Sequence, residues 1–269
     1  MPVLDRLCRF YQRLFPEQSA EAGELVALHA HEDKSAFLGK YFEHELAKGK
    51  KSIERFLSLN REWVGGRVLD FGCGAGGLTF ALREHAASAA GVDLEEYKLA
   101  FARGEAARRG VDGIEFVCYA GERLPFADAS FDTVFCVDVL EHVPKPDLAL
   151  AEMRRVLKPG GLLLLSFGPP WGHPHGKHTW TRLPGWWSHL LFPQAVCMRV
   201  IGLPTDCTWE ALGLHRLTVR KFDRHIRRSG FVQLHRQDNI RRRVAPLKWI
   251  PFVRDLFISE VVGIYRKPG

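Results

Sequence analysis

A short run of glycines follows the first segment of the chain that predicts a buried strand. Gly72, Gly74 and Gly76 lie just after Asp70, in the order Asp-Phe-Gly-Cys-Gly-Ala-Gly. Glycine lets the backbone turn tightly and lets a ligand approach the main chain closely. The helix expected after the run offers free amides at its N-terminus. The loop therefore predicts a site for a nucleoside-containing ligand at the carboxyl edge of a parallel sheet.

The glycine spacing alone does not identify the ligand. Gly72, Gly74 and Gly77 fit the dinucleotide pattern GxGxxG, whereas Gly72, Gly74 and Gly76 fit a GxGxG loop. Asp93 ends the next predicted strand, about twenty residues further on, where a carboxylate accepts hydrogen bonds from ribose hydroxyls. This second feature indicates a nucleoside cofactor in either case.

Further motifs narrow the choice of cofactor. Asp70 precedes the glycines, where its carboxylate would orient a cationic, amino-acid-like group. Three more motifs follow in order: Leu124-Pro125-Phe126 with Ser130-Phe131-Asp132, then Asp138-Val139-Leu140-Glu141-His142-Val143, then Leu157-Lys158-Pro159-Gly160-Gly161. Over residues 63–167, this ordered set resembles the class I S-adenosylmethionine-dependent methyltransferases, in particular the small-molecule group with LPF…SFD and LKPGG motifs. The resemblance implies S-adenosyl-L-methionine as cofactor and a Rossmann-like fold.

The resemblance also implies a set of cofactor-binding residues at the matching positions. In the family, these hold the methionine part, the ribose and the adenine; here they are Asp70, Gly72, Gly74 and Gly76, then Asp93, then Leu94, Gly121 and Glu122. Asp138 falls where the family contacts the cofactor's amino group or the substrate. Ala120 stands where the family often has an acidic residue against the adenine amine, so Glu122 or a backbone group would take over that contact.

The elements that must position these residues alternate along the chain. Short apolar runs predict strands at 67–71, 89–93, 114–118, 131–137, 162–167, 231–236 and 258–265. Helical spacing predicts helices at 77–85, 96–109, 146–157 and 217–229. Strands that alternate with helices indicate an α/β fold with a doubly wound, mostly parallel, seven-stranded sheet covered on both faces.

Two regions fall outside this alternation. Residues 1–62 predict an N-terminal helical cap, with a second helical stretch from about residue 35 to residue 60, and residues 63–269 form the methyltransferase core. Residues 168–215 are rich in Pro, Gly, His and Trp and read as a substrate-side insertion after the fifth strand. Because the core holds the cofactor, we expect the cap and the insertion to recognise the methyl acceptor.

The insertion begins with three histidines, His173, His175 and His178. One of them near the carboxyl edge of the sheet would serve as a general base, and His178 is the preferred candidate, with His173 and His175 as alternatives. A metal site is a second interpretation. We expect none, because the Pro and Gly residues of the loop give it no fixed face and no acidic or Cys ligand stands beside it. The third interpretation is that the histidines are polar loop residues that bond to the backbone.

The segment 180–193 of the insertion contains three Trp, one Phe and three Leu. It is consistent with a hydrophobic lid over an apolar substrate. It is also consistent with an interfacial element at a membrane surface, or with an apolar anchor that packs the insertion onto the core.

Positive charge is concentrated in one part of the chain. The net charge is +7, and residues 216–254 contain twelve Lys or Arg against two Asp. Such a segment can meet RNA, anionic lipid or an acidic substrate, or can keep the protein in solution. Aromatic residues for base stacking are sparse between the arginines, including Arg241–Arg243, so a nucleic-acid partner is not expected.

Composition defines the general class of the protein. The chain has 269 residues, 46% hydrophobic and 26% charged, which is typical of a globular protein. No apolar run approaches the roughly 18 residues of a spanning helix, and the six cysteines form no CxxC pair. These features predict a cytoplasmic protein with reduced thiols.

Together these observations predict a methyltransferase that modifies O or N, and less often C, of a small, largely apolar molecule. An RNA or protein methyltransferase that uses the 216–254 segment is one alternative. A non-catalytic regulatory protein that binds S-adenosylmethionine is another. The sequence leaves the acceptor and the oligomeric state open, and a peripheral membrane contact remains an alternative.

Overall fold

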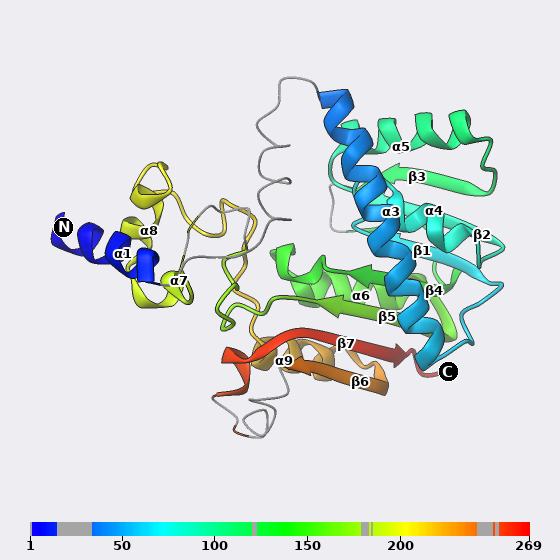
Figure 1. The fold of residues 1–269 in the computed structure, drawn as a ribbon. Coiled ribbons are helices and arrows are strands. Elements are labelled where there is room, and N and C mark those ends of the chain that lie inside the picture. The colour runs from blue at the N-terminus through cyan, green and yellow to red at the C-terminus, as the bar shows by residue number, and fades with distance from the viewer. Residues whose placement is uncertain are drawn as a thin grey trace.

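The computed structural model describes residues 2–14, 34–119, 123–178, 183, 185–240, 250 and 253–269, and a seven-stranded sheet forms its centre. The strands are β1 (Arg67–Phe71), β2 (Ser88–Asp93), β3 (Ile114–Cys118), β4 (Phe131–Val137), β5 (Leu157–Phe167), β6 (Val232–Ile240) and β7 (Ile258–Arg266). Their order across the sheet is β3-β2-β1-β4-β5-β7-β6 (Figure 1). The strands from β3 to β5 pair in parallel, and β7 runs antiparallel to β5 and β6.

The strand order reverses between β1 and β4. The chain moves outward from β1 through β2 to β3, and then returns to place β4 on the other side of β1. In an open parallel sheet, a ligand crevice forms outside the carboxyl ends of the strands at such a reversal. The loops after β1 and β4, which begin at Gly72 and Asp138, both open onto this point.

Helices cover both faces of the sheet. One face is covered by α3 (Lys34–Leu59), α4 (Gly77–Arg83) and α5 (Glu96–Arg109), and the other by α6 (Pro146–Val156) and α9 (Val219–Ser229) (Figure 1). Successive strand residues are buried on opposite faces. For example, Val68 packs with the α3 and α4 side and Leu69 with the α6 side. Because both faces are covered, the strands are apolar throughout rather than alternating.

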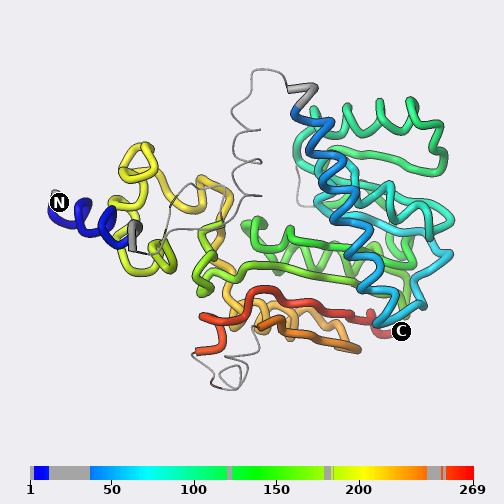
Figure 2. The backbone as a smooth tube through the Cα atoms, viewed as in Figure 1, coloured from blue at the N-terminus to red at the C-terminus, as the bar shows by residue number. Residues whose placement is uncertain are grey.

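The insertion and the first helix form a separate lobe, which we call the insertion lobe. It contains α1 (Pro2–Leu14), α7 (Ser188–Leu191) and α8 (Gln194–Val200), which lie together beyond one end of the sheet (Figure 2). Asp5 of α1 pairs with Arg199 of α8 at 2.8 Å, and the Tyr11 hydroxyl donates to the Trp186 carbonyl at 2.9 Å. The lobe has its own small core of Leu183, Cys197, Met198, Trp209 and Leu214.

Two 3-10 turns complete the described elements. η1 (Leu140–His142) follows β4 directly, and η4 (Arg254–Leu256) leads into β7. In the part of the chain that the structure describes, no helix combines the length and apolar character that crossing a membrane requires.

The predicted fold class is confirmed, and the differences lie at element boundaries. β6 continues to Ile240, beyond the predicted end at residue 236. α9 begins at Val219 rather than at residue 217, because the Thr218 side chain accepts the Lys221 N–H and caps the helix there. β5 begins at Leu157, five residues before the predicted start, and so includes the whole Lys-Pro-Gly-Gly turn.

Candidate active site

A cavity of about 610 Å³ lies at the carboxyl ends of β1, β2 and β4, within the usual range for small-molecule sites of roughly 300–1,000 Å³. Five of the predicted site residues line it: Gly72, Gly74, Asp93, Leu94 and Asp138. Much of the remaining wall is apolar or aromatic and includes Phe71, Val92, Tyr119, Val139 and Leu148. The sequence motifs therefore converge on one concave space.

The glycine loop forms one wall of this cavity and requires glycine at two positions. Gly72 and Gly74 have φ values of +78° and +55°, in the left-handed region that residues with a side chain rarely adopt. A Cβ on Gly72 would lie 2.5 Å from the Val139 side chain, and one on Gly74 would meet the Glu45 carboxylate. The backbone of the loop therefore lies directly against the cavity.

Asp93 is held at the end of β2 by the loops on either side. Its Oδ2 accepts the Gly74 N–H at 2.9 Å, and its Oδ1 accepts the Glu95 N–H at 3.0 Å. Each carboxylate oxygen keeps a further lone pair for a ligand hydroxyl. Leu94 follows with a side chain that is 66% exposed, which offers an apolar surface beside the carboxylate.

Asp70 lies behind the glycine loop and is fully buried. Its Oδ2 accepts the Thr79 hydroxyl at 2.7 Å, and burial raises the pKa of Asp70 to about 7. Asp70 lines a second cavity of about 70 Å³, which shares Gly72 with the large cavity and is also lined by Glu45 and Lys48. The two cavities therefore meet at the start of the loop.

Glu45 is a site residue that the sequence did not reveal. It reaches the glycine loop from α3, where its Oε2 accepts the Ala75 N–H at 3.0 Å and the Tyr41 hydroxyl bonds to the carboxylate. Burial raises the pKa of Glu45 to about 7. Nothing in a helical pattern shows which of its polar residues points inward, so no sequence signal distinguished Glu45.

The carboxylates of Asp70 and Glu45 show whether the site suits a positively charged cofactor. A buried carboxylate and a half-buried one beside the same loop are costly to ionise unless a positive group neutralises them. An ammonium or sulfonium group has the required charge, and the Asp93 carboxylate suits ribose hydroxyls. The residues present therefore fit S-adenosylmethionine.

Asp138 connects the end of β4 to α3. It has a φ of +56°, and its N–H donates to the Ser166 carbonyl at 2.8 Å. Its Oδ1 accepts the Ser166 hydroxyl at 3.1 Å, and its Oδ2 pairs with the Lys48 ammonium at 2.6 Å. Lys48, which the sequence also did not single out, thus adds a cation where the two cavities meet.

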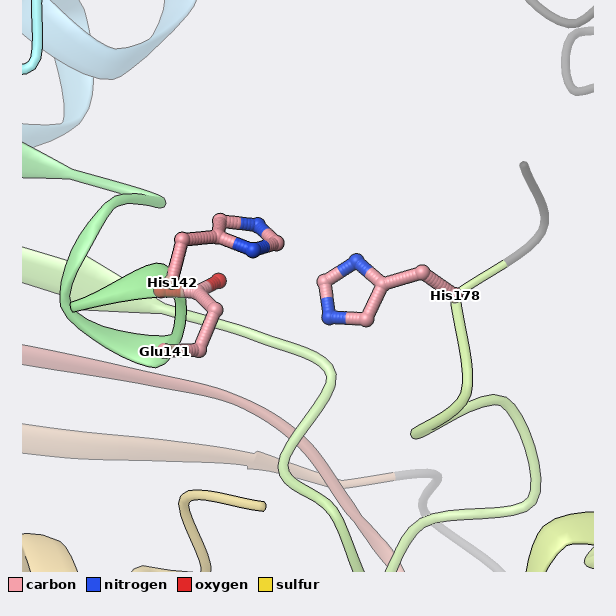
Figure 3. Close-up of side chains that lie close together, drawn as sticks. All are labelled: Glu141, His142 and His178. Carbon is pink, nitrogen blue, oxygen red and sulfur yellow. The ribbon is translucent and has the colours of Figure 1, made fainter. Parts of the chain in front are cut away.

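His178 lies close to the large cavity and faces His142 from the opposite side of a small cluster that also contains Glu141 (Figure 3). The ring centroids of the two histidines are 5.0 Å apart. Burial lowers the pKa of His178 to about 3 and also lowers the pKa of His142, so both rings are neutral near pH 7. A neutral ring can accept a proton, but a pKa this low makes His178 a weak base.

The other two loop histidines lie elsewhere. The rings of His173 and His175 are 5.5 Å apart, and His175 also contacts Trp186 at 6.5 Å. Neither residue lines a described cavity. His178 lines neither cavity itself, but of the three candidate bases it is the one whose ring contacts a cavity-lining residue, His142.

Several other predicted positions lie outside the two cavities or outside the described residues. Gly76 lines neither cavity and caps α4, where a Cβ would lie 2.9 Å from the Phe116 ring. Gly121, Glu122 and Ala120 lie outside the described residues, so the predicted adenine contacts there stay predictions.

The basic segment is partly neutralised by its own neighbours. Arg236 pairs with Asp223 and Asp238, and Arg254 also pairs with Asp223. Arg241–Arg243 lie outside the described residues. Among the described residues, these pairings give no support to a nucleic-acid surface.

The described residues of the Trp-rich segment 180–193 pack partly into the insertion lobe. The Trp187 indole donates to the Gly172 carbonyl at 3.0 Å, and Leu183 is buried in the core of the lobe. Trp186, Leu190 and Leu191 remain exposed. One side of this segment therefore anchors the lobe, while the other side is apolar and accessible.

Comparison with known proteins agrees with this geometry. Residues 69–165 match the family model described as a methyltransferase domain. The chain is 44% identical over 103 residues to a ubiquinone biosynthesis O-methyltransferase of Idiomarina loihiensis, an alignment that covers 38% of this chain and 42% of that protein. It is 39% identical over 111 residues to 24-methylenesterol C-methyltransferase 2 of Oryza sativa subsp. japonica, covering 40% of this chain and 31% of that protein. These alignments span less than half of either relative.

Solved structures resemble the chain over more of its length. An S-adenosylmethionine-dependent methyltransferase from Mesorhizobium loti is 24% identical with a TM-score of 0.52, covering 76% of this chain and 92% of that one. The cyclase SpnF is 21% identical with a TM-score of 0.53, covering 80% and 81%. Residues 69–165 thus match a methyltransferase domain, and the sheet around them has the Rossmann-like fold of the solved methyltransferase structures.

Proposed function

We propose that this chain transfers a methyl group from S-adenosylmethionine to an oxygen or nitrogen, less often a carbon, of a small, largely apolar molecule. The observation that carries the proposal is the convergence of the glycine loop, Asp93 and Asp138 on one cavity of about 610 Å³. The match of residues 69–165 to a methyltransferase domain supports it independently. We place the activity in the cytoplasm, which the six free cysteines support.

Bound S-adenosylmethionine supplies a methyl group on a positively charged sulfur, which an electron-rich acceptor atom attacks in line. Asp70 and Glu45 would stabilise positive charge near the glycine loop, since the first carboxylate is buried and the second half-buried there. Asp93 accepts the ribose hydroxyls, and Leu94 provides the apolar surface for the adenine. The chain's main contribution is to orient the reactants and exclude water.

The apolar wall of the cavity supports a small, apolar acceptor. Val139, Val143, Pro144 and Leu148 line the side of the cavity that leads toward α6, and their side chains offer few hydrogen bonds. His142 and Asp138 provide polar groups at the edge of this wall. The relatives named above, an O-methyltransferase of ubiquinone biosynthesis and a sterol C-methyltransferase, support an acceptor of this kind.

Methyl transfer in a fractionated extract tests this proposal directly. Purified protein and S-adenosylmethionine with a labelled methyl group are added to an extract that is then separated into RNA, protein, lipid-soluble and polar small-molecule fractions. We expect label in the lipid-soluble or small-molecule fraction, and none with the Asp93→Ala variant. Label that enters RNA or protein instead would overturn the proposed substrate class, and no protein-dependent label in any fraction would overturn the enzymatic function.

A further inference from the structure

Glu141, His142 and His178 form a cluster whose chemistry the methyl-transfer site does not explain. Each side chain offers one ligand atom, and these atoms lie within 4.8 Å of one another. Figure 3 shows the two imidazole rings pointing toward each other, with the Glu141 carboxylate beside the His142 ring. Glu141 and His142 come from η1 after β4, whereas His178 comes from the insertion.

Glu141 contributes a buried oxygen that has no partner. Its Oε1 accepts the Gly168 N–H at 3.1 Å. Its Oε2 has no hydrogen-bond partner among the described residues. This oxygen is also buried, since only 4% of the residue is exposed. An unpaired buried carboxylate oxygen is costly and is stabilised by a cation placed against it.

His142 is oriented as a metal ligand. Its Nδ1 lies 2.8 Å from the Gly213 carbonyl oxygen. Because a carbonyl only accepts, Nδ1 carries the proton and Nε2 keeps its lone pair. A backbone carbonyl on the far nitrogen is the arrangement that fixes ring orientation in metal-bound histidines.

We propose that Glu141, His142 and His178 bind one divalent metal ion of the zinc type, with an open position that takes an oxygen of the methyl acceptor. Two histidines and one glutamate are a known ligand set for zinc sites that keep a fourth position open. A tetrahedral ion with bonds of about 2.1 Å holds its ligand atoms roughly 3.4 Å apart. The ligand atoms, which lie within 4.8 Å of one another, therefore need to approach by at most about 1.4 Å. His142 and Asp138 line the large cavity, so the open position lies on the acceptor's side.

This site changes the role of His178. A histidine that binds a metal ion is a ligand and does not act as a base. The ion would instead lower the pKa of an acceptor hydroxyl, whose proton leaves to solvent. This role in methyl transfer rests on the proposed function, but the ion-binding site itself does not.

Zinc binding tests the site. The full chain is stripped with a chelator, and Zn²⁺ is titrated in competition with a chromophoric chelator. We expect one ion per chain. The affinity for Zn²⁺ should be about 100-fold or more weaker in His178→Asn and in Glu141→Gln. Loss of a group that only orients a ligand already costs roughly 10–100-fold, and loss of the ligand itself costs more. Asn tolerates the left-handed backbone of residue 178, whose φ is +58°, and Gln keeps an acceptor for the Gly168 N–H.

The matched control is His175→Ala, which removes a histidine of the same loop outside the cluster and leaves the affinity unchanged. Absence of Zn²⁺ binding in the unmodified chain, or equal affinity in His178→Asn and Glu141→Gln, overturns the proposal. If either variant is unfolded, the absorption spectrum of Co²⁺ bound to the unmodified chain decides: bands of a four-coordinate N/O site support the proposal, and an octahedral spectrum overturns it. S-adenosylmethionine binding is measured in parallel, so a failure of the proposed function would appear as lost cofactor binding with zinc binding intact.

Discussion

Asp93 supports both the fold of the glycine loop and the proposed ribose contact. Replacement by Ala removes the acceptor of the Gly74 and Glu95 N–H groups and the two oxygens available to the ribose. We expect Asp93→Ala to weaken S-adenosylmethionine binding by at least about tenfold, since one hydrogen bond to a charged group contributes roughly 1.5–3 kcal/mol. Isothermal titration calorimetry measures this change.

Asp206→Ala is the control for that measurement, because Asp206 is exposed in the insertion and lines neither cavity. Asp93→Asn, which keeps one acceptor oxygen, gives an intermediate affinity. Wild-type affinity in Asp93→Ala would contradict the assignment of the cofactor site.

The buried carboxylates predict how cofactor binding depends on pH. The pKa values of Asp70 and Glu45 are raised to about 7 in the folded chain, so below pH 7 these groups are protonated and neutral. A cationic cofactor binds better to the ionised carboxylates, and its affinity therefore rises with pH. For one such group, we expect binding about tenfold weaker at pH 6 than at pH 8, measured by calorimetry in matched ionic strength.

Glu45→Gln isolates one of these two groups. It keeps an acceptor for the Ala75 N–H and removes the titration, so the pH dependence becomes shallower. An unchanged pH profile in Glu45→Gln would show that Glu45 does not contact the cationic part of the cofactor.

At the scale of single residues, the sequence predicted the groups that lie in contiguous motifs. Asp93 ends β2, and Gly72 and Asp138 directly follow β1 and β4, so the predicted strands place them at one edge of the sheet. Glu45 and Lys48 could not be predicted, because their position depends on how α3 packs across the loop. Glu141 and His142 were part of a recognised motif, but only the fold of the insertion brings His178 to them.

The contact between α3 and α4 places Glu45 and Lys48 in the site. A Cβ on Gly77 would lie 2.4 Å from the Leu46 backbone nitrogen and 2.6 Å from the Glu45 Cβ. We expect Gly77→Ala to push the helices apart, to destabilise the chain by about 1–3 kcal/mol, and to weaken cofactor binding. Urea denaturation measures the stability.

Gly104→Ala in α5 is the matched control for this helix contact. A Cβ on Gly104 would have no neighbouring atom within 4 Å among the described residues, so Ala adds helix propensity without a clash. We expect Gly104→Ala to stabilise the chain by about 0.5–1 kcal/mol. A Gly77→Ala chain as stable as the wild type would show that the two helices separate without cost.

The strands and helices of the core were predictable because each carries its own local signal. β1, β3, β4 and α5 have the predicted bounds. Gly72, Gly110 and Asp138 directly follow β1, α5 and β4 and mark where these elements end. The insertion lobe was not predictable in detail. Its short helices and its core form from residues distant in sequence, which include α1.

For the whole molecule, the insertion lobe is distinct from the part of the chain that lines the proposed cofactor site. α1 contacts the rest of the insertion lobe through the Asp5–Arg199 pair and the Tyr11 hydroxyl, whereas the glycine loop belongs to the core. We expect deletion of residues 2–14 to leave S-adenosylmethionine affinity within about twofold. The deletion should also expose Cys197, which is fully buried, to a thiol reagent.

Asp5→Ala is the control for the deletion, because it removes only the ion pair, worth roughly 0–1 kcal/mol at a partly exposed site. Its Cys197 should remain protected from the reagent. A deletion variant with protected Cys197 would show that the lobe folds without α1.

The contact between α1 and α8 also orders events during synthesis. Residues 2–14 are made before their partner at Gln194–Val200, which follows only after β1 to β5. At roughly 5–20 residues per second, the interval is about ten seconds or more. During this interval, the face of α1 that carries Cys8, which is buried in the folded chain, lacks its native partner. The nascent chain thus carries this amphipathic segment without its native partner while the sheet assembles.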